Sequence, residues 1–331
     1  MQIPSIPFQR RTLVRTALAL TIAAPFGHSF AQQGAWPTKP VRGVVGFAAG
    51  GGVDVMARAV GVPLAEMLGQ SIVIDNKPGA AGNVAASDVI RSAPDGYNIL
   101  FGTSFGQAVN HLLIKGTPNM ARDLVPVAII GRYKFHLVVR SELPVNSVAE
   151  LVAYAKANPG KLTFANSGAG TQPHLLGVLF EKQAGINVLH VPYKGSGPAL
   201  QAMLSKDTDA VFDPGIAFPH VDSGKLKILA ITSEKRPPLY PRVPTMTEAG
   251  VPGMDADAWI GVWVPTGTPP AVVARLNQSL ATIVARPDIQ KRFNDMSAEA
   301  IHLDTAKFRG VLANEEKIYG GLIRERNITI D

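Results

Sequence analysis

The sequence predicts an α/β protein with two lobes, each built on a mostly parallel β-sheet flanked by helices. Three observations lead to this fold class. Short apolar runs alternate with segments of helical spacing, and the alternation starts near residue 41 and again near residue 162. Two further segments share one order of strand, extended segment, proline and helix. The chain has 331 residues, which is long enough for two lobes.

The first half of the pattern predicts a sheet of three parallel strands. Its strands are expected at residues 41–47, 72–74 and 97–101, with helices at residues 53–68 and 84–90. In the first helix the apolar residues recur at the spacing of one helix face. Because β-α-β connections are right-handed, every loop from a strand to a helix is expected at one edge of this sheet.

The second half repeats this pattern. Its strands are expected at residues 162–165, 188–191 and 210–213, with helices around residues 175–183 and 199–204. Two such units in series predict two lobes, and one large sheet with long insertions is the alternative.

Two segments are expected to connect the lobes. In the first segment, apolar runs at 127–130 and 137–139 are followed by Pro144 and a helix near Ser147. In the second segment, apolar runs at 228–231 and 262–264 are followed by Pro269, Pro270 and a helix at 271–284. Two crossings form a hinge, which permits closure over a ligand. The expected lobes are residues 32–132 with 252–331, and residues 133–251.

The N-terminus predicts export. Arg10 and Arg11 belong to a basic start without acidic residues, and the apolar stretch at residues 17–26 is too short to cross a membrane. Small residues at Ser29 and Ala31 indicate a cleavable signal peptide, residues 1–31, cut after Ala31. The paired arginines leave the general secretory route and the twin-arginine route open. An uncleaved anchor is the alternative.

Charge and cysteine content exclude several classes of function. The formal net charge falls from +7 to +4 once the three arginines of the signal are removed, and the remaining basic residues are scattered. A nucleic-acid partner is therefore not expected, because counterion release requires clustered basic residues. The chain has no cysteine, and its seven histidines lack metal-ligand spacing, so no metal and no cofactor is expected.

A glycine-rich loop follows the first strand: Phe47-Ala48-Ala49-Gly50-Gly51-Gly52-Val53-Asp54. Such a loop exposes backbone N–H groups at the positive end of a helix, which suits a carboxylate or a phosphate. Asp54 either complements the helix dipole or belongs to the site. The glycines match neither the P-loop nor the dinucleotide fingerprint, although Asp75 at the end of the next strand leaves a dinucleotide site as an alternative.

The second half contains a similar loop, Ser167-Gly168-Ala169-Gly170-Thr171, with His174 one turn later. His174 either donates to a carboxylate or is a structural cap or a partly buried packing residue. A hydrolase triad of Ser167, His174 and Asp213 is disfavoured, because the G-x-S-x-G elbow is missing. Thr103, Ser104 and Asp213 stand at two further strand ends, where ligands of open α/β sheets bind.

Several motifs in a shared order resemble one family. They are Ala48-Ala49-Gly50-Gly51-Gly52-Val53-Asp54, Asn76-Lys77-Pro78-Gly79-Ala80-Ala81-Gly82, Pro94-Asp95-Gly96-Tyr97, His190-Val191-Pro192-Tyr193-Lys194-Gly195, Phe212-Asp213, Val243-Pro244-Thr245 and Glu248-Ala249-Gly250. They resemble the Bug/TctC family, the solute receptors of tripartite tricarboxylate transporters. This resemblance implies a two-lobed periplasmic-binding-protein fold of the Venus flytrap type, in which two loops clamp a carboxylate.

The resemblance also implies a ligand-binding set. It consists of Phe47, Ala48, Ala49, Gly50, Gly51, Asp54, Thr103, Ser104, Ser167, Gly168, Ala169, Gly170, Thr171, His174 and Asp213. The chain departs from the family pattern at Gly46, where proline is usual, at Asn83, where glycine is common, and at Thr171, where serine is frequent. Phe105 replaces a smaller residue, and it either stacks on an aromatic ligand or packs under the loop.

Together these features predict a periplasmic solute-binding protein and not an enzyme. Its expected ligand is a dicarboxylate, a tricarboxylate or an aromatic carboxylate such as terephthalate. Its expected partners are the membrane subunits of a tripartite tricarboxylate-type transporter, and the protein is expected to be a monomer. A ligand-sensing receptor that docks on a signalling partner is the alternative, and a serine hydrolase is a remote one.

Overall fold

The computed structural model describes residues 1–2, 36–236, 239–254, 256–296 and 298–330. The predicted signal peptide lies almost entirely outside the described residues. Residues 37–331 form one compact unit. In the part of the chain that is described, no helix is both long and apolar enough to span a bilayer.

The larger sheet has the predicted parallel strands at one side and antiparallel strands at the other. Its strand order is β11-β4-β10-β3-β1-β2. The strands are β1 (Val41–Val45), β2 (Ile72–Asn76), β3 (Asn98–Thr103), β4 (Leu124–Lys134), β10 (Asp257–Pro265) and β11 (Ala298–Leu303). β1 pairs with β2 and β3 in parallel, as predicted, whereas β10 and β11 pair antiparallel with their neighbours. The sheet is therefore mixed rather than mostly parallel.

The smaller sheet follows the same plan, with strand order β7-β6-β8-β5-β9. The strands are β5 (His136–Arg140), β6 (Thr163–Asn166), β7 (Leu189–Pro192), β8 (Ala210–Asp213) and β9 (Leu226–Ile231). β6 pairs in parallel with β7 and β8, and β5 pairs antiparallel with β8 and β9. Its helices are α5 (Val148–Ala157), α6 (Gln172–Ala184), α7 (Ser196–Leu204) and α8 (Phe218–Asp222).

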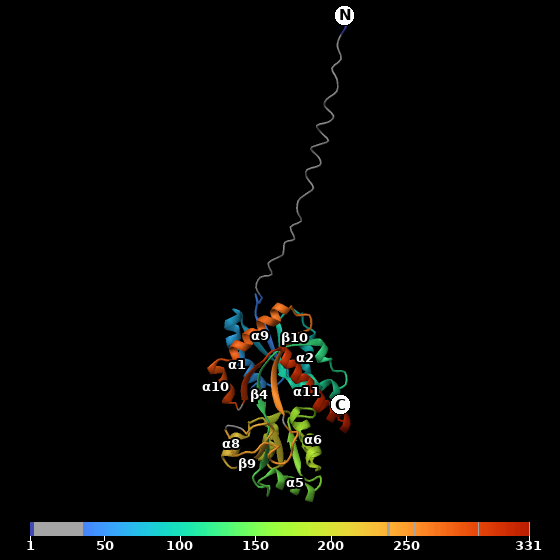
Figure 1. Ribbon diagram of the computed structural model, residues 1–331, viewed down its shortest axis with the longest axis vertical. Coiled ribbons are helices and arrows are strands. Elements are labelled where there is room, and N and C mark those ends of the chain that lie inside the picture. Colours follow the sequence, from blue (N-terminus) through green and yellow to red (C-terminus); the bar gives the residue numbers. More distant parts are fainter. Residues whose placement is uncertain (3–35, 237–238, 255, 297, 331) are drawn as a thin grey trace. The chain divides into compact units, whose positions relative to one another are not determined.

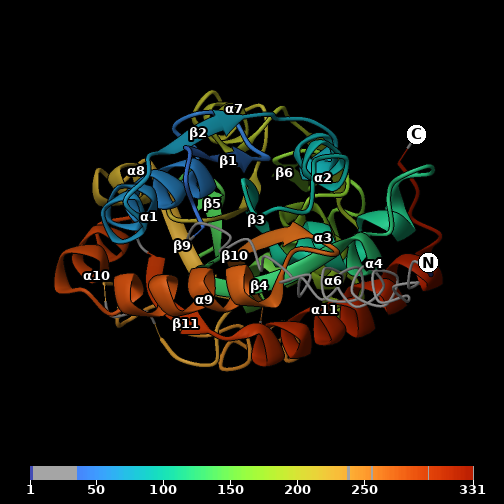
Figure 2. The same ribbon diagram turned by 90° about the horizontal axis from the view of Figure 1, so that it is seen from above.

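Helices cover both faces of the larger sheet. They are α1 (Gly52–Leu68), the 3₁₀ turn η1 (Ala80–Gly82), α2 (Asn83–Ile90), α3 (Ser104–Leu113), α4 (Met120–Asp123), α9 (Pro270–Val284), α10 (Pro287–Asn294) and α11 (Thr305–Arg326). α2 and α11 share one core with the sheet, where the rings of Trp263 and Phe308 lie 4.8 Å apart. α1 contacts α9, and α9 and α11 lie along the β4 and β11 side (Figure 2). The helices α3, α10 and α11 are elements that the sequence analysis did not predict.

The chain changes sheets at two places. β4 ends at Lys134 and β5 begins at His136, so Phe135 alone separates the two sheets. The chain returns between Ile231, the end of β9, and Asp257, the start of β10. Both connectors thus contain the predicted strands, and Figure 1 shows β4 and β10 running toward the smaller sheet.

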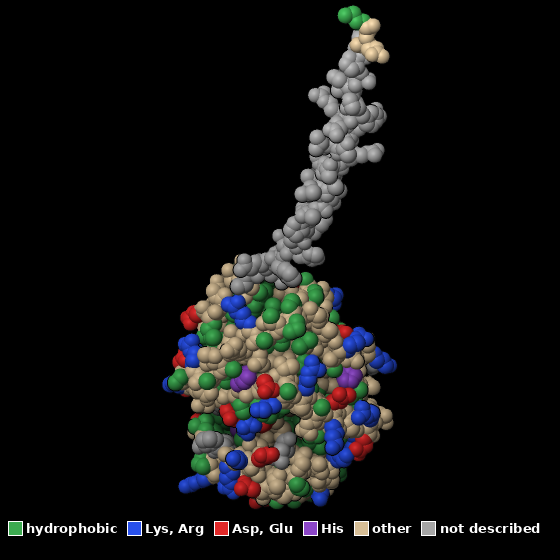
Figure 3. All heavy atoms as spheres, turned by 45° about the horizontal axis from the view of Figure 1, so that its top comes forward, with side chains coloured by type: hydrophobic (Ala, Val, Ile, Leu, Met, Phe, Trp, Pro, Cys, Tyr) green, Lys and Arg blue, Asp and Glu red, His purple; other side chains and the backbone are tan. Residues whose placement is uncertain are grey.

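A second core belongs to the smaller sheet and extends to helices α3 and α11 of the larger one. It contains Phe105 and Val109 of α3, Leu175 of α6, and Tyr319 and Leu322 of α11, all of them buried. Burial of each such side chain contributes roughly 1.5–3 kcal/mol, and side chains of α6, α3 and α11 therefore share one core. On the face that Figure 3 shows, acidic and basic side chains are intermixed.

Candidate ligand-binding site

The hydrogen-bond register brings the carboxyl edges of both sheets to the hinge. In the larger sheet Thr103, the last residue of β3, pairs with Ile260 near the start of β10. In the smaller sheet Asp213, the last residue of β8, pairs with His136, the first residue of β5. Consecutive Cα atoms are ~3.8 Å apart, and only Phe135 lies between the sheets at this crossing. The loops that follow the parallel strands therefore start from two edges that meet at the hinge.

Loop one, residues 47–54, is braced from beneath by Asp54. The buried Asp54 carboxylate accepts the Gly50 N–H at 2.9 Å, the Asn76 amide at 2.8 Å and the Arg58 guanidinium at 3.0 Å. Burial by itself raises the pKa of Asp54, but the hydrogen bonds from Arg58, Gly50 and Asn76 outweigh it and lower the pKa. Asn76 also donates to the carbonyl of Phe47 at 3.0 Å. Asp54 thus holds the loop, and its own oxygens are occupied.

The upper side of loop one is open. Ala48, Ala49 and Gly50 are exposed, and Gly50 has the left-handed φ of +80° that glycine adopts without strain. Gly51 is the residue that precedes α1, and its N–H donates to the carbonyl of Ala48 at 3.1 Å. Among the described residues, none accepts from the N–H groups of Gly52, Val53 or Asp54. These donors sit at the positive end of α1.

The departure from the family pattern at Gly46 has a packing explanation. Gly46 is buried, and a Cβ atom there would lie 3.0 Å from the Cα of Gly82. The turn that contains Gly82 is also tied to α3, because Asn110 donates to the carbonyl of Ala81 at 3.1 Å and to the Asn83 side chain at 3.0 Å. Gly46 therefore lets this turn approach loop one closely, and Asn83 anchors it.

Loop two, residues 167–174, is a compact turn held by its own side chains. The Thr171 hydroxyl donates to the carbonyl of Gly168 at 2.7 Å and accepts from Ser167 at 3.2 Å. The N–H of Gly168, which has φ +134°, donates to Asn166 at 3.1 Å. Ala169 is exposed. Within the described part of the chain, the N–H groups of Ala169, Gln172 and His174 have no acceptor.

His174 supports loop two through its ring. Its Nδ1 accepts the Gly170 N–H at 3.1 Å, so the ring proton belongs on Nε2. Burial, followed by the nearby His190, lowers the pKa of His174 to about 4. The ring of His190 packs edge-on against it at 5.1 Å, and His190 Nε2 hydrogen-bonds Glu181 at 2.9 Å. His174 is therefore neutral at physiological pH and braces the turn before α6.

The third strand end of the larger sheet leads into the buried helix α3. Thr103 precedes this helix and is half-buried. Ser104 is fully buried and donates to Glu315 of α11 at 2.8 Å, so its hydroxyl is withdrawn from solvent. Phe105 is also buried, and its ring meets the ring of Tyr319 edge-on at 5.0 Å. Phe105 thus packs under the loop.

Asp213 ends β8 as a buried cap. Its carboxylate accepts the N–H groups of Gly215 at 2.6 Å and Ala217 at 3.0 Å. Burial raises the pKa of Asp213 to about 6, although these N–H bonds act in the opposite direction. The carboxylate shapes the turn before α8 at the edge that faces the hinge.

Comparison with known proteins identifies the family. The model of the tripartite tricarboxylate transporter family receptor matches residues 56–328. This chain belongs to that family. The receptor is 35% identical to Protein BugT of Bordetella pertussis over 294 residues, which are 88% of this chain and 90% of BugT.

Solved structures of relatives share the fold of the receptor. Rpa4515 of R. palustris with adipate is 34% identical and has a TM-score of 0.83 over 89% of this chain and 100% of that chain. MatC from Rhodopseudomonas palustris with bound malate is 30% identical, with a TM-score of 0.79 over 87% of this chain and 99% of MatC. The periplasmic binding protein BugD is 33% identical, with a TM-score of 0.78 over 89% and 100%. The receptor is therefore a solute-binding protein of the two-lobed type and not an enzyme.

The geometry of the receptor agrees with this class. The hydroxyl of Ser167 donates to Thr171, His174 Nδ1 is occupied by Gly170, and Asp213 caps its own turn. Across the described residues, Ser167, His174 and Asp213 form no hydrogen bond with one another. A hydrolase triad is therefore not assembled.

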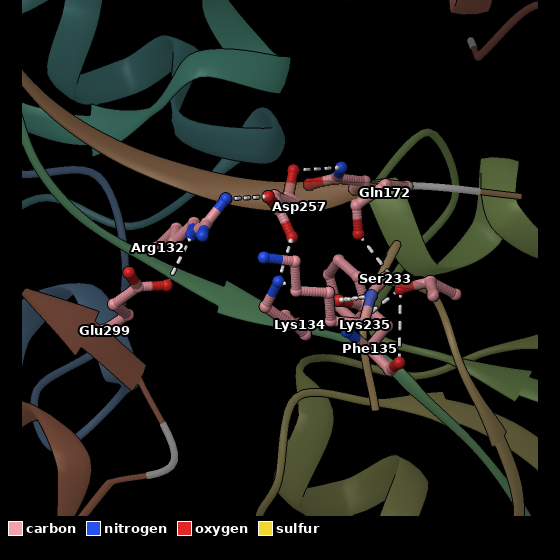
Figure 4. A network of polar contacts seen from close by, with 10 residues as sticks. Arg132, Lys134, Phe135, Gln172, Ser233, Lys235, Asp257 and Glu299 are labelled. Carbon is pink, nitrogen blue, oxygen red and sulfur yellow. Dashed lines mark hydrogen bonds and ion pairs between the residues drawn. The ribbon is translucent and has the colours of Figure 1, made fainter. Parts of the chain in front are cut away.

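A polar network at the hinge was not identified from the sequence (Figure 4). Arg132 contacts Asp257 and Glu299, both at 2.7 Å, and Lys134 donates to Ser233 at 2.8 Å. These side chains join the two crossings of the chain. The sequence does contain a sign of this network, because the basic residues Arg132 and Lys134 alternate with other residues at the end of an otherwise apolar strand.

A surface hollow of about 670 Å³ lies elsewhere, along α7 between Tyr193 and Asp207. It is wide open and contains none of the predicted ligand-binding residues. We place the candidate site at the loops because their unpaired donors stand at two helix starts on strand edges that meet at the hinge, whereas the hollow borders the start of α7 alone.

Proposed function

We propose that the receptor is a periplasmic protein that captures a small dicarboxylate between its lobes and delivers it to the membrane subunits of a tripartite tricarboxylate-type transporter. The supporting observation is the pair of loops at the starts of α1 and α6, whose unpaired N–H groups stand on carboxyl edges that meet at the hinge. Each loop supplies donors and a helix dipole for an anion. The proposed contacts are the loops at 47–54 and 167–174, with Thr103 and Asp213.

The ligand class follows from the relatives and from the buried aromatic residue. The relatives solved with adipate and with malate both bind a dicarboxylate. In this receptor Phe105 is turned into the core against Tyr319, so it offers no ring face to an aromatic ligand. An aliphatic dicarboxylate therefore fits better than terephthalate.

Titration calorimetry tests the ligand class. The panel contains malate, adipate, citrate, terephthalate and inorganic phosphate. We expect one-to-one binding of at least one aliphatic dicarboxylate, and the absence of heat from every carboxylate would refute the proposal. Delivery is tested separately, by uptake of the labelled ligand in cells that make the membrane subunits with or without the receptor.

Two glycines that flank α1 form a matched pair for testing loop one. Gly50, in the loop, has φ +80°, and Gly69, at the far end of the same helix, has φ +72°. A Cβ atom at either position meets nothing within 4 Å. Gly50→Ala and Gly69→Ala should therefore each destabilise the fold by ~1–2 kcal/mol, the cost of a left-handed alanine.

Only Gly50→Ala should also weaken ligand binding, because it biases loop one away from the conformation that presents its N–H groups. We expect a loss of ~10-fold or more in affinity, equivalent to ~1.4 kcal/mol. Calorimetry and thermal unfolding are measured on both variants. Equal affinities of the two variants would remove loop one from the site.

A further inference from the structure

The C-terminal tail, residues 327–330, reaches the end of α3. α11 ends at Arg326, the next residue Asn327 has a left-handed φ of 50°, and the N–H of Ile328 donates to the carbonyl of Ile323 at 3.0 Å. The N–H of Ile330 then donates to the carbonyl of Leu113 at 2.9 Å. Ile330 also forms a parallel bridge with Ile114. The tail is therefore fixed on the larger-sheet side of the molecule.

The side chain of Ile330 lies on loop two, which belongs to the other sheet. Gly170 is buried and has φ +73°. A Cβ atom at Gly170 would lie 1.9 Å from Cδ1 of Ile330 and 3.5 Å from Cδ1 of Leu113. Real Cβ contacts are far longer than 1.9 Å, so Ile330 rests directly on the backbone of this glycine. The position demands glycine for its conformation and for space.

Gly170 is also held by its own lobe. Its N–H donates to His174, and His190 packs against the His174 ring. His190 in turn lies on the surface of α6 at Gly177, where a Cβ atom would come within 2.8 Å of the His190 ring. Loop two is thus restrained at Gly170 both by His174, which packs on His190, and by the tail.

Two further contacts join the same parts of the molecule. Lys182 of α6 and Glu325 of α11 form an ion pair at 2.5 Å. Gln172, in the first turn of α6, donates to the carbonyl of Asp257 at 3.0 Å. α6 is therefore tied to the larger-sheet side near both of its ends, through Gln172 and Lys182, and Ile330 is the residue that lies nearest to Gly170 of loop two.

We propose that Ile330 acts as a strap: it is a positioning residue that holds loop two in its ligand-binding conformation. The consequence for binding rests on the proposed function, because it assumes that loop two contacts the ligand. The restraint of Gly170 by Ile330 does not depend on the proposed function.

Hydrogen exchange of the full-length mature protein tests the restraint without any ligand. Ile330→Ala should raise the exchange rate of peptides covering residues 167–174 by ~10-fold, because opening of loop two becomes easier. Ile328→Ala is the matched control, since Ile328 is a half-buried isoleucine of the same tail that packs on the same core. Peptides of loop one serve as the internal reference. Equal exchange of loop two in both variants would overturn the strap.

Affinity for the ligand found in calorimetry tests the consequence. Ile330→Ala should weaken binding ~5- to 10-fold, whereas Ile328→Ala should leave it within ~2-fold. Gly170→Ala should reduce binding further, and the double variant with Ile330→Ala should recover part of that loss because the clash is relieved. Gly185→Ala, at the other end of α6 with φ +61° and nothing within 4 Å, reports the cost of the left-handed alanine alone.

The outcomes separate the two proposals. Faster exchange of loop two with unchanged affinity means that the strap is real and that loop two lies outside the site. Unchanged exchange in Ile330→Ala overturns the strap, whatever the ligand does. Wild-type protein that binds no carboxylate refutes the proposed function, and the exchange experiment still decides the strap.

Discussion

Glu315 is the buried acid whose ionisation should govern the stability of the receptor at alkaline pH. It is buried on α11, where one carboxyl oxygen accepts from Ser104 at 2.8 Å and the other has no partner among the described residues. Burial raises the pKa of Glu315 to about 8, the Ser104 hydrogen bond lowers it, and the charge of Asp257 raises it. At neutral pH the group is therefore mostly protonated in the folded state.

The sign of the pH dependence follows from this raised pKa. The folded protein keeps a proton on Glu315 that the unfolded chain releases near its ordinary value of 4.5. The stabilisation that the protonated Glu315 provides is fully present below pH 4.5 and is lost as pH rises through 8. Between pH 4.5 and pH 8 the free energy of unfolding falls by ~1.4 kcal/mol per pH unit, so the total loss is roughly 5 kcal/mol. This is a large share of the ~5–15 kcal/mol by which domains are stable.

Glu315→Gln provides the test, because glutamine is isosteric and does not ionise. Urea unfolding of the wild type and the variant is measured at each unit from pH 5 to 9. The difference in free energy of unfolding, wild type minus variant, should fall by ~1.4 kcal/mol per unit up to pH 8 and then level off. Other titrating groups are present in both proteins and largely cancel in this difference.

Glu316→Gln is the control for this prediction. Glu316 is the next residue of α11, its side chain is half exposed, and it lies 3.9 Å from His111. Its removal should change stability by at most ~1 kcal/mol, because exposed ion pairs contribute little. Parallel curves for wild type and Glu315→Gln between pH 5 and 8 would refute the buried-acid reasoning.

Two shorter predictions concern the ligand and the N-terminus. Phe105→Leu should destabilise the fold by ~1–2 kcal/mol through loss of the ring contact with Tyr319. It should leave the ranking of aliphatic over aromatic carboxylates in calorimetry unchanged, and a reversed ranking would place Phe105 in the site. The mass of exported protein should correspond to a chain that starts at Gln32, and a larger mass would contradict cleavage after Ala31.

The elements that were predicted from the sequence are those with local and repeated signals. The parallel strands of both sheets are short apolar runs, and their helices follow glycine-rich loops at regular intervals. The connectors were recognised because the order of strand, proline and helix occurs twice. In each case the pattern depends on one segment and its neighbours, so no knowledge of distant contacts was needed.

The helix α3 was missed because its buried face is partly polar. Ser104, Gln107 and Asn110 are all buried, and their partners come from distant segments such as Glu315 and the turn at Ala81. Helical periodicity assumes that polar residues face water. A helix surrounded on all sides therefore leaves no stripe in the sequence.

The sequence identified the two loops but did not distinguish side chains that face outward from those that brace the loop. Asp54 and Ser104 both lie in the first turn of a helix that follows a strand, where ligand contacts are expected. The structure turns each of them inward, Asp54 to the Gly50 N–H and Ser104 to Glu315. This direction is decided by Arg58 and Glu315, whose positions follow from the packing of whole helices.

Buried polar residues connect Glu315 to loop two. Glu315 acts electrostatically on Tyr319, which lies one helical turn away on α11 and whose pKa burial and this charge both raise. Tyr319 contacts Gln172 at 3.4 Å, and Gln172 lies next to the strapped turn at Gly170. Ionisation of Glu315 would add a charge to the core that packs α6 against α3 and α11, and an unpaired buried charge is costly. We expect the packing of α6 on this side of the molecule to loosen in response, and the contact between Ile330 and Gly170 to loosen with it. The affinity for the ligand should therefore decline over the pH range in which the stability declines, and Glu315→Gln should abolish both changes together.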